Sequence, residues 1–523
     1  MRSRILRAVI GVAGVVFVSK LLGLLREMVI ARQFGTSAEY DVYLIGVMLP
    51  ALLAGVLAFA SYFLTVPYLT RLFTQTLETG AARTRVWSSF NVTVLVAILV
   101  TILTIFAAPW LMRFWGGGYD EARFAQVIFY SRMTAGIILL TTTEAFLRAA
   151  LNARDVVTYP AAGLVLFNVI AVGTVLLFSE RYGVGAIALG LIAGLLAQNL
   201  MLVVRALPSG LVPQFTTSFS GNDIRPLGAV AGLLILTELL NRSYFLIDRY
   251  FAPRFGDGII AALNYSQVLV QLPDAIVGFS IASVLFPLFA EHSADNDEQK
   301  FSYLFHKAII GGLLVAVPLA VLFFTNASDI IQLIFRRGQF DTRSTEMTAA
   351  VLRPYVPAIV ALFAISTSIR ACYAQGWVKQ VLGLTLGALV LKFITTSFLS
   401  DWFGYPGISM ATSVSQVTLS AALLWLVMRL ARTSASLRLV SSIARLVVIG
   451  LICTVTMYFL NPAIGRIINS VAWSQALSRV VVSAACLGVI FSLLAWFSGF
   501  DGELRKFFAA GASSPDKPVS NGA

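Results

Sequence analysis

The chain has little charge for its length. Of its 523 residues 12% are charged and 58% are hydrophobic, whereas roughly a quarter are charged in an ordinary soluble protein. The mean hydropathy is +0.85. Up to about residue 505 no long polar stretch separates one part from another, as linkers between soluble domains would. These absences argue against a water-soluble enzyme and indicate a membrane protein.

Residues that could hold a metal or a disulfide framework are also scarce. The three cysteines, Cys372, Cys453 and Cys486, are scattered in or at the ends of apolar runs, which is typical of packing residues. The two histidines, His292 and His306, flank one predicted loop. The sequence contains no G-x-x-x-x-G-K-[ST] motif, and its loops are too short for a catalytic domain. We therefore expect no cofactor, no metal and no enzymatic activity.

What the sequence has in abundance is apolar runs of about 20 residues, the length of a helix that crosses about 30 Å of hydrocarbon. Runs such as VLVAILVTILTIFAA, from Val94, do not alternate between apolar and polar residues, so helices are favoured over a β-barrel. No small-residue cleavage site precedes Lys20, which predicts an uncleaved first helix. The fourteen predicted spans of this all-α polytopic protein are 8–28, 38–66, 89–112, 123–147, 158–178, 184–204, 227–248, 259–290, 304–325, 345–371, 380–399, 406–428, 440–460 and 476–498.

The formal net charge of +13 follows the predicted topology. Lys and Arg are more frequent in the segments that a cytoplasmic N-terminus would place inside, including Arg2, Arg4 and Arg7. By the positive-inside rule this predicts that both termini are cytoplasmic. The excess charge therefore reflects orientation, and nucleic acid is not an expected partner.

The chain repeats itself at an offset of about 222 residues. The matches are Leu49-Pro50 with Leu272-Pro273, Val66-Pro67 with Phe286-Pro287, Arg148 with Arg370, Gly185 with Gly407, and Arg205 with Arg429. A repeat of six helices gives two parallel lobes, an arrangement typical of transporters that expose a central cleft to each side in turn. We expect lobes at 1–206 and 207–432, two extra helices at 433–500, and a disordered cytoplasmic tail at 501–523.

Charged residues inside spans are costly and require partners or a hydrated cavity. Lys20 and Arg26 are six residues apart, about 9 Å along a helix, and could both contact one elongated anion, with Asp41 nearby in the next span. The alternative is that Arg26 reaches the headgroups and Lys20 pairs with Asp41.

Five further charges lie in later spans. Glu238 and Arg242 have the spacing of an intrahelical ion pair, whereas Lys392 needs a partner from another helix, for which Glu238 is one candidate. These three could serve ion coupling or act as counter-charges. Arg132 lies twelve residues before Glu144, so both could face inward and add an anion contact and a counterion.

Three segments resemble the MurJ/MviN lipid II flippases: SKLLGLLREMVIARQFGTSAEYD from Ser19, ALNYSQVLVQLPDAIVGFSIASVLFPLFAEHS from Ala262, and LIFRRGQFDTRSTEMTAAVLRPYVPAI from Leu333. The resemblance covers essentially the whole membrane part. It implies the fold of the MOP superfamily, which includes the MATE-like transporters, with two six-helix lobes and two C-terminal helices. It also implies a bacterial inner-membrane protein that moves undecaprenyl-diphosphate-linked peptidoglycan precursor, lipid II, to the outer leaflet. Membrane lipids and cell-wall synthesis proteins are the further partners expected.

Residue by residue, the resemblance implies a cationic cavity for the diphosphate and a groove beside the two extra helices for the lipid tail. Arg26 matches a cavity arginine of the family, and Lys20 stands where the family usually has another arginine. Asp41 matches the acid that begins the second helix. Gly55 and Val268 stand where two further family arginines are expected, and Lys392 stands on a helix that carries cation-binding carboxylates in some members.

These departures keep alternatives open. The first hypothesis is a lipid II flippase that works by alternating access. The second is a flippase for another undecaprenyl-diphosphate oligosaccharide, of the O-antigen or exopolysaccharide type. A third is a membrane scaffold that does not transport, and a fourth is a polysaccharide ligase, for which the largest outside loop, with Arg336, Arg337 and Asp341, shows no evident nucleophile.

Overall fold

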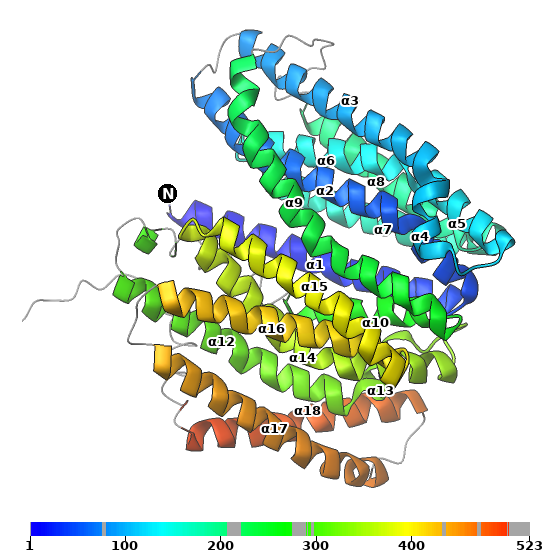
Figure 1. Ribbon diagram of the computed structural model, residues 1–523, viewed down its shortest axis with the longest axis vertical. Helices are drawn as coiled ribbons and strands as arrows, with labels where there is room; N and C mark the ends of the chain where they lie inside the picture. Colours follow the sequence, from blue (N-terminus) through cyan, green and yellow to red (C-terminus); the bar gives the residue numbers. More distant parts are fainter. Residues whose placement is uncertain are drawn as a thin grey trace, which may run out of the picture. The chain divides into compact units, whose positions relative to one another are not determined.

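The computed structural model describes residues 2–75, 80–206, 221–274, 289, 291–293, 298–430, 436–467, 472–498 and 500, and within these ranges it contains helices and turns but no strand (Figure 1). The first half holds α1 (Arg2–Phe34), α2 (Ala38–Gln75), α3 (Gly80–Leu111), α4 (Arg113–Gly116), α5 (Glu121–Thr134), α6 (Gly136–Asn152), α7 (Thr158–Tyr182) and α8 (Gly185–Ala206). The second half holds α9 (Gly221–Phe251), η2 (Ala252–Phe255), α10 (Ile259–Pro273), α12 (Glu298–Thr325), α13 (Ala327–Phe335), α14 (Thr342–Ala374), α15 (Val378–Phe403), α16 (Pro406–Leu430), α17 (Ser436–Ile467) and α18 (Ala472–Phe497). The predicted tail at 501–523 lies outside the described residues.

Within the described residues, 11 helical segments are long and apolar enough to cross a membrane. They correspond to the second to sixth and the ninth to fourteenth predicted spans. The other three fall on α1, α9 and α10, each of which contains or adjoins residues outside the described part. Helices α1 and α9 have 33 and 31 residues, more than the roughly 20 that a span requires. The polytopic helical fold is confirmed, while the number fourteen stays a prediction.

The helix order repeats at nearly the offset found in the sequence. Equivalent helices begin between 218 and 221 residues apart: α1 and α9, α2 and α10, α3 and α12, α7 and α15, and α8 and α16, while α14 corresponds to α5 and α6 together. The order of the helices therefore occurs twice along the chain, with one continuous helix in the second copy where the first has α5 and α6.

The helices form two compact units. The first contains Met1–Val268, Ile334–Val351 and Thr385–Ala411; the second contains Leu269–Leu333, Leu352–Leu384 and Thr412–Ala523. The first unit takes helices from both copies of the repeat, whereas the second takes helices from the second copy together with α17 and α18. The units therefore describe packing, and the lobe boundaries at 206 and 432 stay a prediction.

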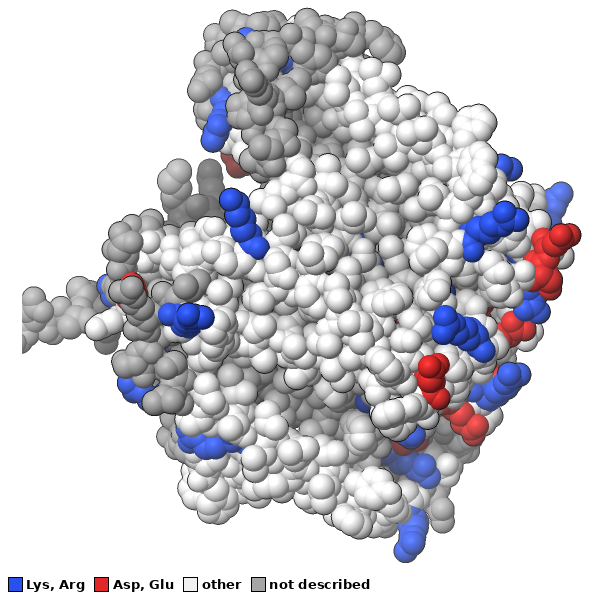
Figure 2. Space-filling view, viewed as in Figure 1, with Lys and Arg blue, Asp and Glu red and all other residues white. Residues whose placement is uncertain are grey.

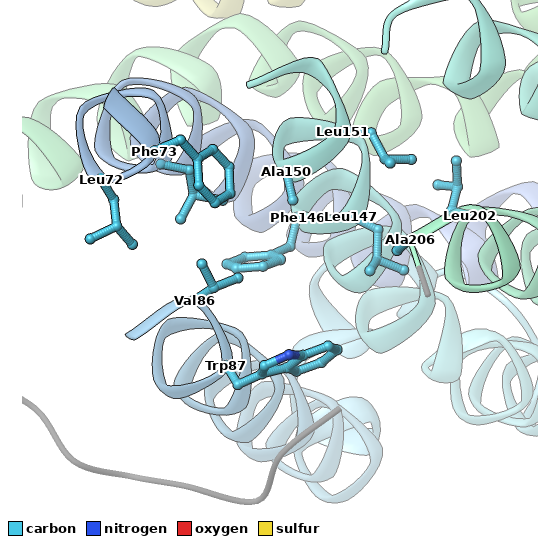
Figure 3. Close-up of a cluster of buried hydrophobic side chains, with 11 residues drawn as sticks. Leu72, Phe73, Val86, Trp87, Phe146, Leu147, Ala150, Leu151, Leu202 and Ala206 are labelled. Carbon is cyan, nitrogen blue, oxygen red and sulfur yellow. The ribbon is translucent and has the colours of Figure 1, made fainter. Parts of the chain in front are cut away.

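In the first unit α2 packs against α3, α5, α6 and α9, and α7 packs against α1 and α8 (Figure 1). Figure 3 shows a buried apolar cluster in which side chains of α2, α3, α6 and α8 meet. Its rings include Phe146 of α6, which lies edge-on to Phe90 of α3 at 5.2 Å between ring centroids. This packing holds α2 in place as the central helix of the unit.

In the second unit α12 packs against α17 and α18, which also pack against each other. A polar link reinforces this group: the amide nitrogen of Asn461 on α17 donates to the backbone oxygen of Thr325, at 3.2 Å, and Ser483 on α18 donates to the amide oxygen of Asn461, at 2.9 Å. These two bonds link α17 to the end of α12 and α18 to α17.

The outward surface of the helices is apolar. On α3 the side chains of Leu99, Leu103, Phe106 and Trp110 are exposed, as are Tyr458 and Phe459 on α17. The face in Figure 2 carries its charged side chains mainly toward the helix ends and is almost uncharged between them. Apolar surface of this extent is typical of helices that contact lipid.

Candidate functional site

The first unit contains most of the charged side chains that the sequence placed inside spans. Asp41, at the start of α2, is 2% exposed. Its two carboxylate oxygens accept hydrogen bonds from the backbone N–H groups of Gly258, at 2.6 Å, and Ala261, at 2.7 Å. The first N–H groups of a helix lack partners within the helix, and a carboxylate there is stabilising. Asp41 therefore caps α10 from α2, which differs from the expected role in binding the anion or pairing with Lys20.

Three glycines form a close junction beside this cap. Gly35, Gly258 and Gly338 have positive φ angles of 52°, 90° and 58°, which favour glycine. A β-carbon at any of the three would overlap a backbone oxygen of a neighbouring loop. Glycine is thus favoured at each position both by the backbone angle and by the lack of space for a β-carbon. The loops before α2, α10 and α14 therefore approach more closely than side chains would permit. We refer to this contact as the three-loop junction.

Hydrogen bonds close the three-loop junction. They join the hydroxyls of Thr36 and Ser344 at 2.8 Å, the N–H of Gln339 and the carbonyl of Arg32 at 2.9 Å, and the hydroxyl of Tyr265 and the carbonyl of Gly35 at 2.9 Å. Tyr265 also contacts the rings of Tyr40 and Phe340, with centroids 5.7 and 5.4 Å apart. The loops and the aromatic rings therefore seal one end of the unit.

Next to this seal lies a charged group that we call the Tyr43 cluster: Tyr43, Arg26, Glu27 and Arg249. Arg26 Nη2 donates to Glu27 Oε1 at 3.0 Å. The other carboxylate oxygen of Glu27 is buried and makes no hydrogen bond to a described residue. Arg26, Glu27 and Arg249 all lie within electrostatic range of the Tyr43 hydroxyl. Two guanidinium groups and one incompletely bonded carboxylate thus lie within electrostatic range of one hydroxyl.

The sequence did not identify Arg249 as a candidate site residue, because the seventh predicted span ends at residue 248. In the structure α9 continues to Phe251. The signal was present, because Arg249 follows Arg242 by seven residues, two helical turns, and so lies on nearly the same face. The predicted pair of Glu238 and Arg242 is confirmed: Arg242 Nε donates to Glu238 Oε1 at 2.6 Å.

Lys392 has a different partner from the candidate Glu238. Its ammonium lies 2.8 Å from Asp248 Oδ1 and donates to the backbone oxygen of Tyr244 at 2.7 Å. Gln267 donates to the other oxygen of Asp248 at 2.8 Å. Lys392 is fully buried and the Asp248 side chain is 3% exposed. A buried charge pair of this kind needs such additional hydrogen bonds to offset desolvation.

Two expected anion contacts lie apart from this group. Arg132 is exposed and its Nε donates to the carbonyl of Ile105 on α3, at 3.2 Å. Glu144 is buried instead and pairs with Arg148 at 3.0 Å. The two side chains therefore do not share the inward face that the sequence suggested, since Arg132 is exposed and Glu144 is buried.

Lys20 is exposed and makes no hydrogen bond or ion pair with a described residue. Its neighbour Ser19 is buried against Asn168 of α7, whose amide reaches the Ser19 hydroxyl at 3.4 Å. The structure therefore separates Lys20 from Asp41, and brings Arg26, but not Lys20, to the Tyr43 cluster.

No group of three His, Cys, Asp or Glu side chains that could hold a metal occurs among the described residues. The three cysteines are free, with Cys372 and Cys453 buried.

The fold and its buried charges define the class: a polytopic helical membrane protein. A solved structure described as lipid II flippase MurJ in an inward closed conformation matches with a TM-score of 0.76 at 19% identity, covering 96% of this chain and 99% of that one. An inward-facing MATE family multidrug transporter of the MOP superfamily matches with a TM-score of 0.65 at 14% identity, covering 80% of this chain and 96% of that one.

The family model for lipid II flippase MurJ matches residues 30–471. Lipid II flippase MurJ of Burkholderia cenocepacia is 24% identical over 94% of this chain and 97% of its own length. Probable lipid II flippases MurJ of Bdellovibrio bacteriovorus and Vibrio cholerae are 24% and 23% identical, each over 81% of this chain and 82% of their own length. The chain belongs to the lipid II flippase MurJ family.

Proposed function

We propose that this chain moves lipid II, the undecaprenyl-diphosphate-linked peptidoglycan precursor, from the inner to the outer leaflet of the bacterial cytoplasmic membrane. The observation that carries the proposal is the membership of the family over residues 30–471. The charged interior of the first unit supports it, because a diphosphate crossing hydrocarbon needs cationic groups that replace its hydration.

The Tyr43 cluster has the chemistry that a diphosphate requires. Guanidinium groups bind phosphate oxygens by paired, charge-assisted hydrogen bonds. Arg26 and Arg249 come from different helices, α1 and α9, and both lie near Tyr43. In the proposed mechanism they hold the headgroup diphosphate while the lipid tail stays in the bilayer, and the groove for the tail lies beside α17 and α18.

The three-loop junction is the contact that opens in this mechanism. It joins the loops before α2, α10 and α14 by single hydrogen bonds and close glycine backbones. Each bond contributes roughly 1 kcal/mol net, so ligand binding can offset them. With both termini in the cytoplasm the junction lies on the outer side, and opening releases the headgroup there. An inside-negative potential favours this movement by about 2.3 kcal/mol per charge per 100 mV.

Complementation tests the proposal. The full chain is produced in a bacterium depleted of its own MurJ, and survival, cell shape and lipid II accumulation are measured. We expect restored growth and no accumulation. Arg26→Ala should abolish complementation and Lys20→Ala should weaken it less, both at the membrane level of the unaltered chain, with Arg123→Ala as an exposed control.

The same experiment separates the alternatives. Normal peptidoglycan together with lost surface polysaccharide, after deletion of the chain from its own host, would favour an O-antigen or exopolysaccharide flippase. Full complementation by Arg26→Ala would favour a scaffold that does not transport. Co-purification tests the expected association with cell-wall synthesis proteins, and cysteine labelling from either side tests the orientation of the termini.

A further inference from the structure

Gly55, in the middle of α2, lies directly against a side chain of α9. A β-carbon built at Gly55 would overlap Cζ, Nε and Nη1 of Arg242. The backbone of α2 therefore leaves a space that the guanidinium of Arg242 occupies. Because any other residue at position 55 would compete for this space, Gly55 and Arg242 form one structural element, which we call the Gly55 seat.

The guanidinium in the Gly55 seat is only partly used by the protein. Its Nε donates to Glu238, while Nη1 and Nη2 donate to no described residue. The side chain of Arg242 is 41% exposed. Other cations of the unit differ: Lys392 is fully buried between Asp248 and a carbonyl, and Arg123 donates twice to Asp257.

The geometry therefore fixes the direction of the guanidinium and leaves its outer edge without a partner. Glu238 on one side and the bare backbone of Gly55 on the other determine where the group lies. Two parallel N–H donors, from Nη1 and Nη2, are what a phosphate oxygen pair binds best. Since the guanidinium lies against Gly55 and α2 packs against α9, the group lies on the face of α9 that is turned toward α2.

We propose that Arg242, held in the Gly55 seat, is an anion-binding residue of the transport path and contacts the diphosphate of the lipid substrate. This inference rests on the proposed function, because it assumes a lipid diphosphate as the ligand. Arg249 lies two turns further along α9 on nearly the same face, about 10 Å away along the axis. The diphosphate can therefore pass from Arg242 to the Tyr43 cluster without leaving guanidinium contact.

A double-mutant cycle on the purified full chain tests the inference, with undecaprenyl diphosphate as the binding probe and undecaprenyl phosphate as the comparison ligand. Arg242→Gln removes the charge, and Gly55→Ala displaces the guanidinium while keeping it. Gly173→Ala on α7 is the matched control, because nothing lies within 4 Å of a β-carbon there. The melting temperature in detergent is measured for each variant.

We expect Arg242→Gln and Gly55→Ala each to weaken binding of the diphosphate probe about tenfold, because charge-assisted hydrogen bonds are lost. Binding of the monophosphate should weaken less. The double variant should bind no more weakly than Arg242→Gln alone, since Gly55 acts only through Arg242. Gly173→Ala should bind normally. Arg242→Lys, which keeps the charge but loses the fork, should be several-fold weaker and gives a second measure if Gly55→Ala folds poorly.

Wild-type affinity in Arg242→Gln would overturn the inference, as would additive losses in the double variant. Changes confined to the melting temperature would also overturn it, because they would show packing alone. The outcome is separable from that of the proposed function. A chain that fails to complement MurJ depletion yet binds the probe through Arg242 refutes lipid II transport and keeps the inference, whereas complementation without Arg242-dependent binding does the reverse.

Discussion

Lys392 and Arg242 are two cations within helices of the same unit, and the protein holds them in opposite ways. Lys392 is fully buried, and its ammonium meets a carboxylate and a carbonyl. The side chain of Arg242 is 41% exposed, and its Nε donates a hydrogen bond to Glu238. The Lys392 ammonium also lies 4.9 Å from the centre of the Tyr244 ring, so partners enclose it and we call its pair with Asp248 saturated. Arg242 instead keeps donors that no described residue accepts.

A charge inside a membrane protein is structural or functional according to how much of its bonding capacity the protein itself uses. The cost of burying an ion is high whatever its role, so location alone does not distinguish structure from function. The number of donors and acceptors that the protein itself satisfies does. By this criterion Lys392, Asp248 and Asp41 support the fold, whereas Arg242, Arg26 and Glu27 are left with bonding capacity for a ligand.

The largest expected effect comes from the saturated pair. Lys392→Met leaves Asp248 buried without its cation, which costs about 3–5 kcal/mol in comparable pairs. We expect little folded protein in the membrane and a strongly lowered melting temperature in detergent. The measurement is the yield of monodisperse protein together with the melting temperature.

The double variant Lys392→Met with Asp248→Asn is the control. It removes both charges and should recover most of the lost protein, because no uncompensated charge remains. Recovery of transport as well would establish that the pair is structural. If Lys392→Met folded normally but lost transport, Lys392 would have a role in the substrate path and would not differ from Arg242 in the way described.

The sequence predicted the contacts between helices less well than the contacts within one helix. The pair of Glu238 and Arg242 was predictable because four residues on one helix determine the distance. Asp248 was placed at the end of its span, and its partner comes from α15, so no spacing within one helix could show the pair. The spans and the repeat were predictable because hydropathy is a property of each segment alone.

Asp41 illustrates the same limit. An acid in the first turn of α2 would be expected to stabilise the N-terminus of its own helix. The structure uses it for the N-terminus of α10, whose Gly258 lies 217 positions further along the chain. Which helix ends meet is determined by the packing of α2, α9 and the loops between them, and one sequence does not contain that information in its spacing.

Asp41→Asn should produce the second-largest effect. An amide keeps one acceptor oxygen where the carboxylate used two, and it loses the favourable interaction with the helix N-terminus. We expect a loss of about 2 kcal/mol, seen as a lower melting temperature. Asp120→Asn is the control, because Asp120 caps α5 with one bond from Arg123 N–H and is exposed. Equal effects of the two substitutions would contradict the role given to the buried cap.

Arg26→Lys addresses the unsaturated side of the comparison. The lysine keeps a positive charge beside Glu27 but cannot present two parallel donors. We expect a several-fold drop in transport, at most about tenfold, with little change in melting temperature. Transport is measured in cells as exposure of lipid II to an enzyme added outside. Arg123→Lys is the exposed control, and a melting temperature lowered as much as in Asp41→Asn would place Arg26 among the structural charges.

The smallest effect should come from Asp341, an exposed cap that contrasts with the buried Asp41. Its carboxylate accepts the backbone N–H and the hydroxyl of Ser344, both at 2.8 Å, and these hydrogen bonds hold the pKa of Asp341 below its ordinary value. A lowered pKa in the folded state means that the contribution to stability is present above the ordinary value of about 3.9. It is lost as the pH falls through the folded value.

Asp341→Asn should therefore lower the stability by less than about 1 kcal/mol at neutral pH, the usual worth of an exposed cap. The difference in melting temperature between the chain and this variant should stay constant from pH 8 to about 5 and shrink below about 4. Glu346→Gln removes a nearby exposed carboxylate that makes no hydrogen bond to a described residue, and it should leave the melting temperature unchanged at neutral pH. A difference that grows as the pH falls would show that ionised Asp341 destabilises the folded chain. The weaker effect of Asp341 compared with Asp41 could then not be attributed to its exposure.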